Sequence, residues 1–147
     1  MLHASRRDIE SLVAWTIDEA KKRGAFGADA IYLRGESSHL AMRDGDIEDD
    51  VTGKTSALSL RTLDSAGRQG IAYGNAFDRA DLLSLIEWSL SNCRNAKDDP
   101  YVALFSGTSC GCECGNDVLR LEDPAILSGV PHDQRLRICR EMTELAS

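Results

Sequence analysis

Long apolar runs are missing from this chain. No stretch approaches the ~18 consecutive apolar residues that a transmembrane helix needs, and the first ten residues, MLHASRRDIE, turn polar after four. The start of the chain therefore lacks the apolar core of a signal peptide. The five cysteines are an odd number with three crowded together, which is more typical of reduced thiols than of a secreted disulfide framework. We expect a cytoplasmic protein without a membrane-spanning segment.

Positive charge is also scarce. Lys and Arg number 17 against 24 Asp and Glu, which gives a net charge of −7. The basic clusters, Arg6–Arg7 and Lys21–Arg23, lie at the two ends of one predicted helix, where we expect them to be solvated. Binding to a phosphate backbone depends on clustered Lys and Arg. We therefore expect no nucleic-acid partner.

Helical periodicity predicts two helices that flank the middle of the chain. The first covers about residues 6–23, with Ser5 as its N-cap and Gly24 just beyond its end. The second begins after Asp78 and ends near Ala96. Its apolar stripe consists of Leu82, Leu85, Ile86, Leu90 and Cys93.

Between these helices, from Ala28 to Gly74, apolar residues recur at every second position, which is typical of strands. Asp44–Gly45 is a strong hairpin signal, because a tight type I′ turn needs positive φ at both central residues. The predicted strands are ADAIYLR, SHLAMR, DIEDDV, SALSLRTL and QGIAYG. The pattern predicts an antiparallel meander of four or five strands.

The rest of the chain is less regular. Residues 101 to about 130 show no clear periodicity, and a last helix starts near Pro131. The chain ends inside that helix, so we expect the natural protein to continue past Ser147. The fold class is therefore α+β: helix, strands, helix, irregular segment, helix, with the helices packed on one face of the sheet. We assign residues 1–105 to an N-terminal domain and 106–147 to an irregular cysteine-containing segment and the start of a following helix.

Several of these segments together resemble the N-terminal domain of the TldD/PmbA family. The resemblance rests on AKKRGA at the end of the first helix, YLRGES in the first strand, the RDGDIE hairpin, the GRQG turn, the Asp-capped helix and DDPY after it. It spans roughly residues 20–105. A weaker continuation over residues 119–146, which begins with LRLEDPAI, leans toward the PmbA branch.

The resemblance implies a part in a cytoplasmic proteolytic assembly. TldD-type and PmbA-type (TldE) subunits act there on unfolded peptides, a gyrase-targeting microcin precursor and an antitoxin among them, hence the label modulator of DNA gyrase. The zinc belongs to TldD-type chains, in a His-Glu-x-x-x-His motif with a later cysteine. That motif is absent here, because none of His3, His39 and His132 is followed by Glu.

We therefore assign no catalytic, cofactor-binding or metal-ligating residue to this chain, and we expect it to be inactive by itself. The resemblance also implies its partners: a family subunit, in a homodimer or heterodimer, and unfolded peptide substrates.

The segment SCGCECG offers an alternative, a small thiol- or zinc-binding module organised by Cys110, Cys112 and Cys114. An extended strand would hold neighbouring thiols some 6–7 Å apart, too far for one zinc ion with Zn–S distances of about 2.3 Å. A tight loop could gather them, with further ligands taken from Cys93, Cys139 and His132. We favour an insertion in a variable surface loop.

Two turn motifs also have a functional and a structural interpretation. GRQG could bind an anion through Arg68 and backbone N–H groups, but a two-glycine turn explains it as well. DGDIEDD is rich in carboxylates but does not have the spacing of a calcium loop, so a solvated edge strand is the better interpretation. His39 alternates with Leu40 on a strand, and we expect it to face solvent or to pair across the sheet.

Overall fold

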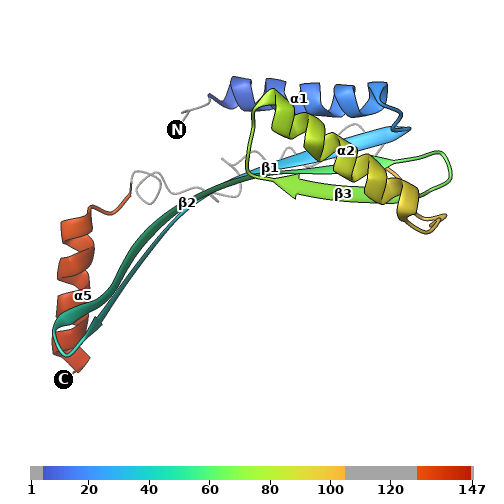
Figure 1. Ribbon diagram of the computed structural model, residues 1–147. Coiled ribbons are helices and arrows are strands. Elements are labelled where there is room, and N and C mark those ends of the chain that lie inside the picture. The colour runs from blue at the N-terminus through green and yellow to red at the C-terminus, as the bar shows by residue number, and fades with distance from the viewer. Residues whose placement is uncertain (1–4, 105–128, 147) are drawn as a thin grey trace, which may run out of the picture. The chain divides into compact units, whose positions relative to one another are not determined.

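The computed structural model describes residues 5–104 and 129–146 (Figure 1). Its elements are, in chain order, helix α1 (Arg6–Lys22), strand β1 (Gly27–Arg43), strand β2 (Asp46–Leu63), strand β3 (Gln69–Gly74), helix α2 (Arg79–Asn95) and helix α5 (His132–Ala146). The strands form one antiparallel sheet in the order β1-β2-β3. The fold is therefore α+β, as predicted. None of the helices within the described ranges is long and apolar enough to cross a membrane.

The chain divides into two compact units. The first consists of Met1–Gly35 and Thr55–Ser106, and it holds α1, β3, α2 and the adjoining parts of β1 and β2. The second consists of Glu36–Lys54 and Gly107–Ser147, which include the hairpin end of β1 and β2 together with α5. The packing described below belongs to the first unit unless the second is named.

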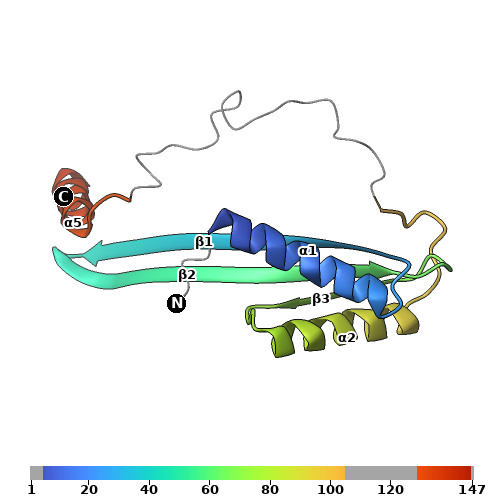
Figure 2. The same cartoon turned by 90° about the horizontal axis from the view of Figure 1, so that it is seen from above.

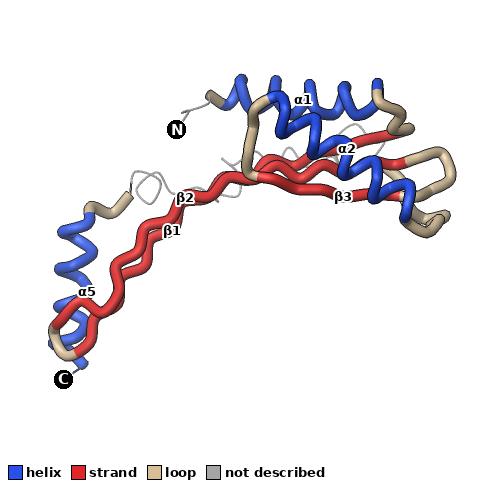
Figure 3. The backbone as a smooth tube through the Cα atoms, viewed as in Figure 1, coloured by secondary structure: helices blue, strands red, loops and turns tan. Residues whose placement is uncertain are grey.

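The number of strands differs from the prediction, because the four segments expected before β3 form only two strands. Figure 3 shows β1 and β2 as uninterrupted stretches joined by a short turn. Gly35 and Gly53, which lie between the predicted segments, are inside these strands. A Cβ on Gly35 would lie 3.1 Å from Thr55 Oγ1, and one on Gly53 would lie 3.1 Å from Ser37 Oγ. Each glycine therefore leaves room for a hydroxyl side chain of the neighbouring strand.

Helix α1 begins at a capping box. Asp8 N donates to Ser5 Oγ over 3.3 Å, and Ser5 N donates to Asp8 Oδ2 over 3.0 Å. These bonds satisfy backbone donors that the first helical turn leaves unpaired. The hydrogen bonds from the Ser5 side chain and backbone hold the pKa of Asp8 below its usual value. The helix ends at Lys22 and is followed by Gly24 at φ 108°, in agreement with the predicted end.

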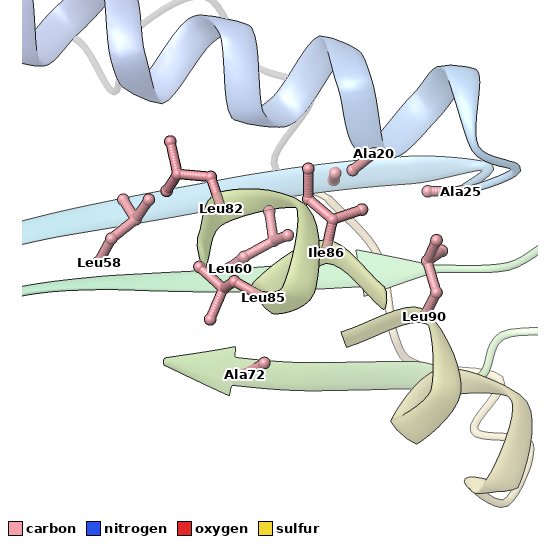
Figure 4. Close-up of a cluster of buried hydrophobic side chains, with 10 residues drawn as sticks. Ala20, Ala25, Leu58, Leu60, Ala72, Leu82, Leu85, Ile86 and Leu90 are labelled. Carbon is pink, nitrogen blue, oxygen red and sulfur yellow. The ribbon is translucent and has the colours of Figure 1, made fainter. Parts of the chain in front are cut away.

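Helix α2 follows the predicted pattern closely. Asp78 caps it by accepting from Asp81 N over 2.9 Å, and all five residues of its predicted apolar stripe are buried. Helices α1 and α2 lie along the same face of the sheet (Figures 1 and 2). Between the helices and the sheet lies the core drawn in Figure 4, which consists of Ala20, Ala25, Ala28, Leu58, Leu60, Ala72, Leu82, Leu85, Ile86 and Leu90.

Candidate interaction surfaces

The GRQG motif forms the turn between β2 and β3. Asp64 Oδ1 accepts from Ala66 N over 2.9 Å and from Arg68 N over 3.0 Å, while Arg68 Nε donates to Asp64 Oδ2 over 2.6 Å. The backbone N–H of Arg68 is the main reason why the pKa of Asp64 lies below its usual value. The Arg68 guanidinium also donates to the carbonyl of Arg94 over 3.3 Å. Because this cation is already satisfied within the turn, the structural interpretation of GRQG fits better than an anion site.

The second glycine of the motif allows α2 to approach β3 very closely. A Cβ on Gly70 would lie 2.1 Å from Ser89 O and 2.2 Å from Cys93 N. The buried Ser89 hydroxyl is hydrogen-bonded to Gly70 O at 3.0 Å and to Thr62 Oγ1 at 2.9 Å, and Cys93 Sγ donates to Arg68 O over 3.2 Å. Polar groups in this contact are therefore paired, as buried polar groups need to be. Burial, with Asp64 nearby, raises the pKa of the Cys93 thiol.

A cavity of about 490 Å³ lies beside this turn. It is lined by residues 64–67, by Phe26 and Gly27, and by residues 99, 100 and 102–104 after α2. The two carboxylates in the lining are engaged, since Asp64 binds Arg68 and Asp99 Oδ1 accepts from Tyr101 N over 2.9 Å. The cavity could receive an apolar group, but its lining does not offer a nucleophile paired with a general base.

The face of the sheet opposite the helices, called the outer face below, carries exposed apolar side chains. Ile31 and Leu33 on β1 are 62% and 63% exposed, and Ile71 and Tyr73 on β3 are 52% and 78% exposed. In the register of β2 and β3, Ser59 lies opposite Tyr73. Ser59 and Arg61 of β2 thus lie between the two apolar rows. An apolar sheet face of this kind is typical of a surface that another part of a protein covers.

One ion pair borders the outer face. Arg61 Nε donates to Asp29 Oδ1 over 3.1 Å, and the second guanidinium nitrogen reaches the other carboxylate oxygen. This bidentate pair joins β1 to β2 and raises the pKa of Arg61, because the guanidinium donates to the carboxylate. Arg61 also lies opposite Ile71 in the register with β3. The outer face is therefore apolar along most of its length and charged at one end.

A second cavity, of about 610 Å³, lies between α1 and β1. Its wall on the helix is formed by Ile9, Glu10, Val13, Ala14 and Ile17, and its wall on the strand by Tyr32 and Arg34. The helix residues lie on the side of α1 that faces away from α2. On the opposite side, the Arg79 guanidinium of α2 stacks 4.6 Å from the Trp15 ring centroid. The apolar side of α1 is thus only partly covered by the described residues.

The carboxylate-rich hairpin belongs to the second unit. Asp44 and Gly45 have φ values of 52° and 87°, which confirms the tight turn expected there. Cross-strand ion pairs join Arg43 to Glu48 at 2.8 Å and Lys54 to Glu36 at 3.4 Å, and His39 Nε2 lies 3.8 Å from Asp49 Oδ2. His39 is exposed and pairs across the ribbon, as expected. Within residues 5–104 and 129–146, no group of three or more His, Cys, Asp or Glu residues could hold a metal ion.

Cys110, Cys112 and Cys114 lie outside the described residues, as does LRLEDPAI. Of the further ligands considered for them, Cys93 is buried in the contact between α2 and β3 and would have to leave the core to bind zinc. His132 Nε2 lies 3.7 Å from Asp50 Oδ2 in the second unit, and Cys139 is half-buried on α5.

Residues 28–93 match a family model described as PmbA/TldA metallopeptidase domain 1. The match begins at the start of β1 and ends near the end of α2, so it includes the whole sheet with the turn and hairpin motifs. The chain contains the first domain of the PmbA/TldD family.

Two solved structures share the fold of this PmbA/TldD domain. A candidate modulator of DNA gyrase from Bacteroides thetaiotaomicron is 20% identical, with a TM-score of 0.74 over 95% of this chain and 31% of that chain. TldE from Thermococcus kodakarensis is 14% identical, with a TM-score of 0.56 over 69% of this chain and 22% of that chain. The chain thus spans less than a third of the length of either structure. We find no significant match among curated proteins.

The exposed outer face of the PmbA/TldD domain was not predicted as a functional surface. The signal for it is present in the sequence, since Ile31 and Leu33 alternate with Ala30 and Tyr32 and Ile71 and Tyr73 alternate with glycine and alanine. Strands that are apolar on both sides are typical of a sheet covered on both faces. The described residues cover only one face of this sheet.

Proposed function

We propose that this chain is the non-catalytic N-terminal domain of a TldD/PmbA-type peptidase assembly in the cytoplasm. In this role it lines the passage by which unfolded peptides reach the active site, and it supports contacts with a second family subunit. The microcin precursor and the antitoxin that the resemblance implies are the first substrates to test. Zinc would be held by the TldD-type subunit, to which the resemblance assigns the ligand motif.

The observation that supports the proposal is the apolar outer face on a domain of this family. Removing apolar surface from water is worth roughly 25 cal/mol per Å², so four exposed apolar side chains on one face favour contact with further protein. A peptide in an extended conformation could also pack on such a surface.

The experiment compares this chain co-expressed with a TldD-type subunit and the 147-residue chain alone. We expect zinc-dependent cleavage of an unfolded peptide by the complex and none by the chain alone. Replacing Ile71 and Tyr73 by Lys should weaken binding to the partner subunit by about tenfold or more, and cleavage should fall with it while the zinc content of the partner stays unchanged.

The matched control is Trp88→Lys, which changes an aromatic side chain of α2 that is also exposed but lies away from the outer face. It should leave binding and cleavage unchanged. Metal-dependent cleavage by the 147-residue chain alone would overturn the assignment as a non-catalytic domain. A complex that forms and yet cleaves no unfolded peptide would overturn the assignment to a peptidase.

A further inference from the structure

The segment that follows α2 forms one wall of the cavity beside the turn between β2 and β3. Residues 97–104, called the strap below, run from the end of α2 past this turn to the start of β1 (Figure 2). The residues of the strap are exposed except Val102 and Leu104, which are half-buried. The strap therefore encloses the cavity while burying little apolar surface of its own.

One end of the strap is held by the GRQG turn. Asp99 N donates to Gly67 O over 3.1 Å. Gly67 has a φ of 82°, and a Cβ there would lie 2.7 Å from Asp99 O. A glycine is needed for this approach, because any other residue would add both a clash with backbone and the strain of positive φ. Arg68 contributes its bond to Arg94 O and lies 3.7 Å from Asp98 Oδ1.

The other end of the strap rests on Gly27 at the start of β1. A Cβ on Gly27 would lie 2.6 Å from Leu104 Cδ1, so this side chain packs directly on the strand. Between the two ends the hydrogen bonds are internal to the strap, since Tyr101 N donates to Asp99 Oδ1 over 2.9 Å and Val102 N donates to Asp99 O over 3.2 Å. Among the described contacts, a single backbone hydrogen bond joins the strap to the turn.

A segment with few buried apolar contacts and exposed hydrogen bonds opens at a lower free energy than the fold as a whole. We infer that the strap is a gate on the cavity, which opens while the helices and the sheet of the first unit stay folded and which the GRQG turn latches in its closed state. Opening removes one wall of the cavity and uncovers Leu63, which is buried when the strap is closed. The motif thus controls how much apolar surface the cavity presents.

Hydrogen exchange of the 147-residue chain tests this inference at the amides of Asp99 and Val102, which are both hydrogen-bonded in the closed strap. We expect these amides to be protected relative to an unstructured peptide and yet to exchange at least about a hundredfold faster than amides of the paired strands β2 and β3. Low concentrations of urea should speed exchange in the strands and leave the strap nearly unchanged, because local opening exposes little surface.

Gly67→Ala should lower the protection of both strap amides at least about tenfold, because its Cβ displaces Asp99 O. The matched control is Gly45→Ala in the hairpin, where φ is also positive at 87° but nothing lies within 4 Å of the added Cβ. This control introduces similar backbone strain without touching the strap. It should change the protection of the strap amides by less than about twofold.

Leu104→Ala loosens the opposite end without backbone strain, so it keeps the test decisive if Gly67→Ala does not fold. It should lower the protection of the Val102 amide about threefold or more, because it removes the side chain packed on Gly27. Tyr101→Ala is its control within the same strap, since the Tyr101 side chain is 93% exposed. We expect this control to change protection by less than about twofold.

Three results would overturn the inference. Strap amides that exchange as slowly as those of β2 and β3 would show that the strap opens only when the domain unfolds. Strap amides without protection in the wild type would show that no closed state is held. Equal losses of protection in Gly67→Ala and Gly45→Ala would show that the GRQG turn is not the latch. The measurements need neither a partner subunit nor a peptide, so the proposed function stands or fails separately.

Discussion

At the scale of single residues, Gly70 determines how closely α2 can pack on β3. Because Gly70 has no side chain, backbone atoms of α2 come very close to it. A Cβ on Gly70 would lie 2.1 Å from a backbone atom of Ser89 and 2.2 Å from one of Cys93. Backbone atoms of a packed helix cannot move aside as the end of a side chain can. We therefore expect Gly70→Ala to destabilise the domain by about 3 kcal/mol.

The measurement is urea unfolding followed by circular dichroism. Gly74→Ala serves as the control on the same strand, because a Cβ there would lie 3.8 Å from Leu85 Cδ1, an ordinary contact. Its free energy of unfolding should stay within about 1 kcal/mol of the wild type. Equal values for the two variants would show that α2 does not pack on Gly70 as described.

Asp64 gives the turn a dependence on pH. Because hydrogen bonds from Arg68 lower the pKa of Asp64 in the folded state, the ionised carboxylate stabilises the fold. This contribution is complete above the ordinary Asp value of about 3.9, and it is lost as the pH falls through the lowered pKa. Asp64→Asn should therefore lower the thermal midpoint at pH 7, and the difference from the wild type should shrink under strongly acidic conditions.

Thermal unfolding monitored from pH 7 to about pH 2 tests this expectation. Asp98→Asn is the control, because this exposed carboxylate lies 3.7 Å from Arg68 Nε and accepts no backbone hydrogen bond among the described contacts. It should change the midpoint little at any pH. A constant difference between Asp64→Asn and the wild type down to the lowest pH would contradict the assigned role.

Several residues of the core could be predicted from the sequence, and others could not. Periodicity identifies the stripe of α2, and every member of it is buried. It does not identify Thr16, Thr62 or Ser89, because polar residues carry no apolar signal. Each of these side chains can be buried because its hydroxyl has a hydrogen-bond partner nearby. Thr16 Oγ1, for example, donates to Leu12 O over 2.8 Å.

At the scale of elements, the start of α1 depends on a cap that the sequence predicts. Ser5→Ala removes the acceptor for Asp8 N and should cost about 1 kcal/mol. The effect should be local, with faster hydrogen exchange in the first turn of α1. Ser84→Ala is the control, since Ser84 sits within α2 and its hydroxyl bonds only to Ala80 O one turn earlier among the described contacts. Equal exchange rates in Ser5→Ala and the wild type would show that the capping box does not hold this turn.

The strands show why sequence reasoning identified the sheet and missed its strand number. Alternation and the Asp44–Gly45 turn gave the antiparallel order correctly. Gly35 lies between the predicted segments ADAIYLR and SHLAMR, and Gly53 lies between DIEDDV and SALSLRTL, where the alternation is interrupted. In the structure each glycine faces a hydroxyl side chain across the ladder, a long-range relation that local patterns do not show.

At the scale of the whole molecule, the question is whether a metal holds the fold together. The apolar core described for the first unit consists of Ala, Leu and Ile side chains. We expect a chelator such as EDTA, or replacement of these three residues by Ser, to change the free energy of unfolding by less than about 0.5 kcal/mol. Metal analysis of the purified chain and thermal unfolding provide the measurement. A large fall in the thermal midpoint on chelation, restored by zinc, would instead favour the thiol- or zinc-binding module.

The family and the α+β class could be predicted because turn motifs and helix caps are local signals that occur together in this sequence. The candidate surfaces could not be predicted as functional surfaces from the sequence. The outer face and the cavity beneath α1 follow from which side of each element the other described residues leave uncovered. Alternation shows that β1 and β3 are apolar on both sides, but which side is covered depends on contacts between distant segments.

The unbroken pairing of β1 with β2 also constrains how the hairpin can change in length during evolution. Side chains alternate with a period of two, so one extra residue in a single strand would shift the register and reverse the faces beyond it. An addition of two residues to each strand keeps every existing pair and leaves every side chain on its own face. The ribbon can therefore grow or shrink by four residues at a time, two on each strand, and an odd difference between relatives should mark a bulge at that position.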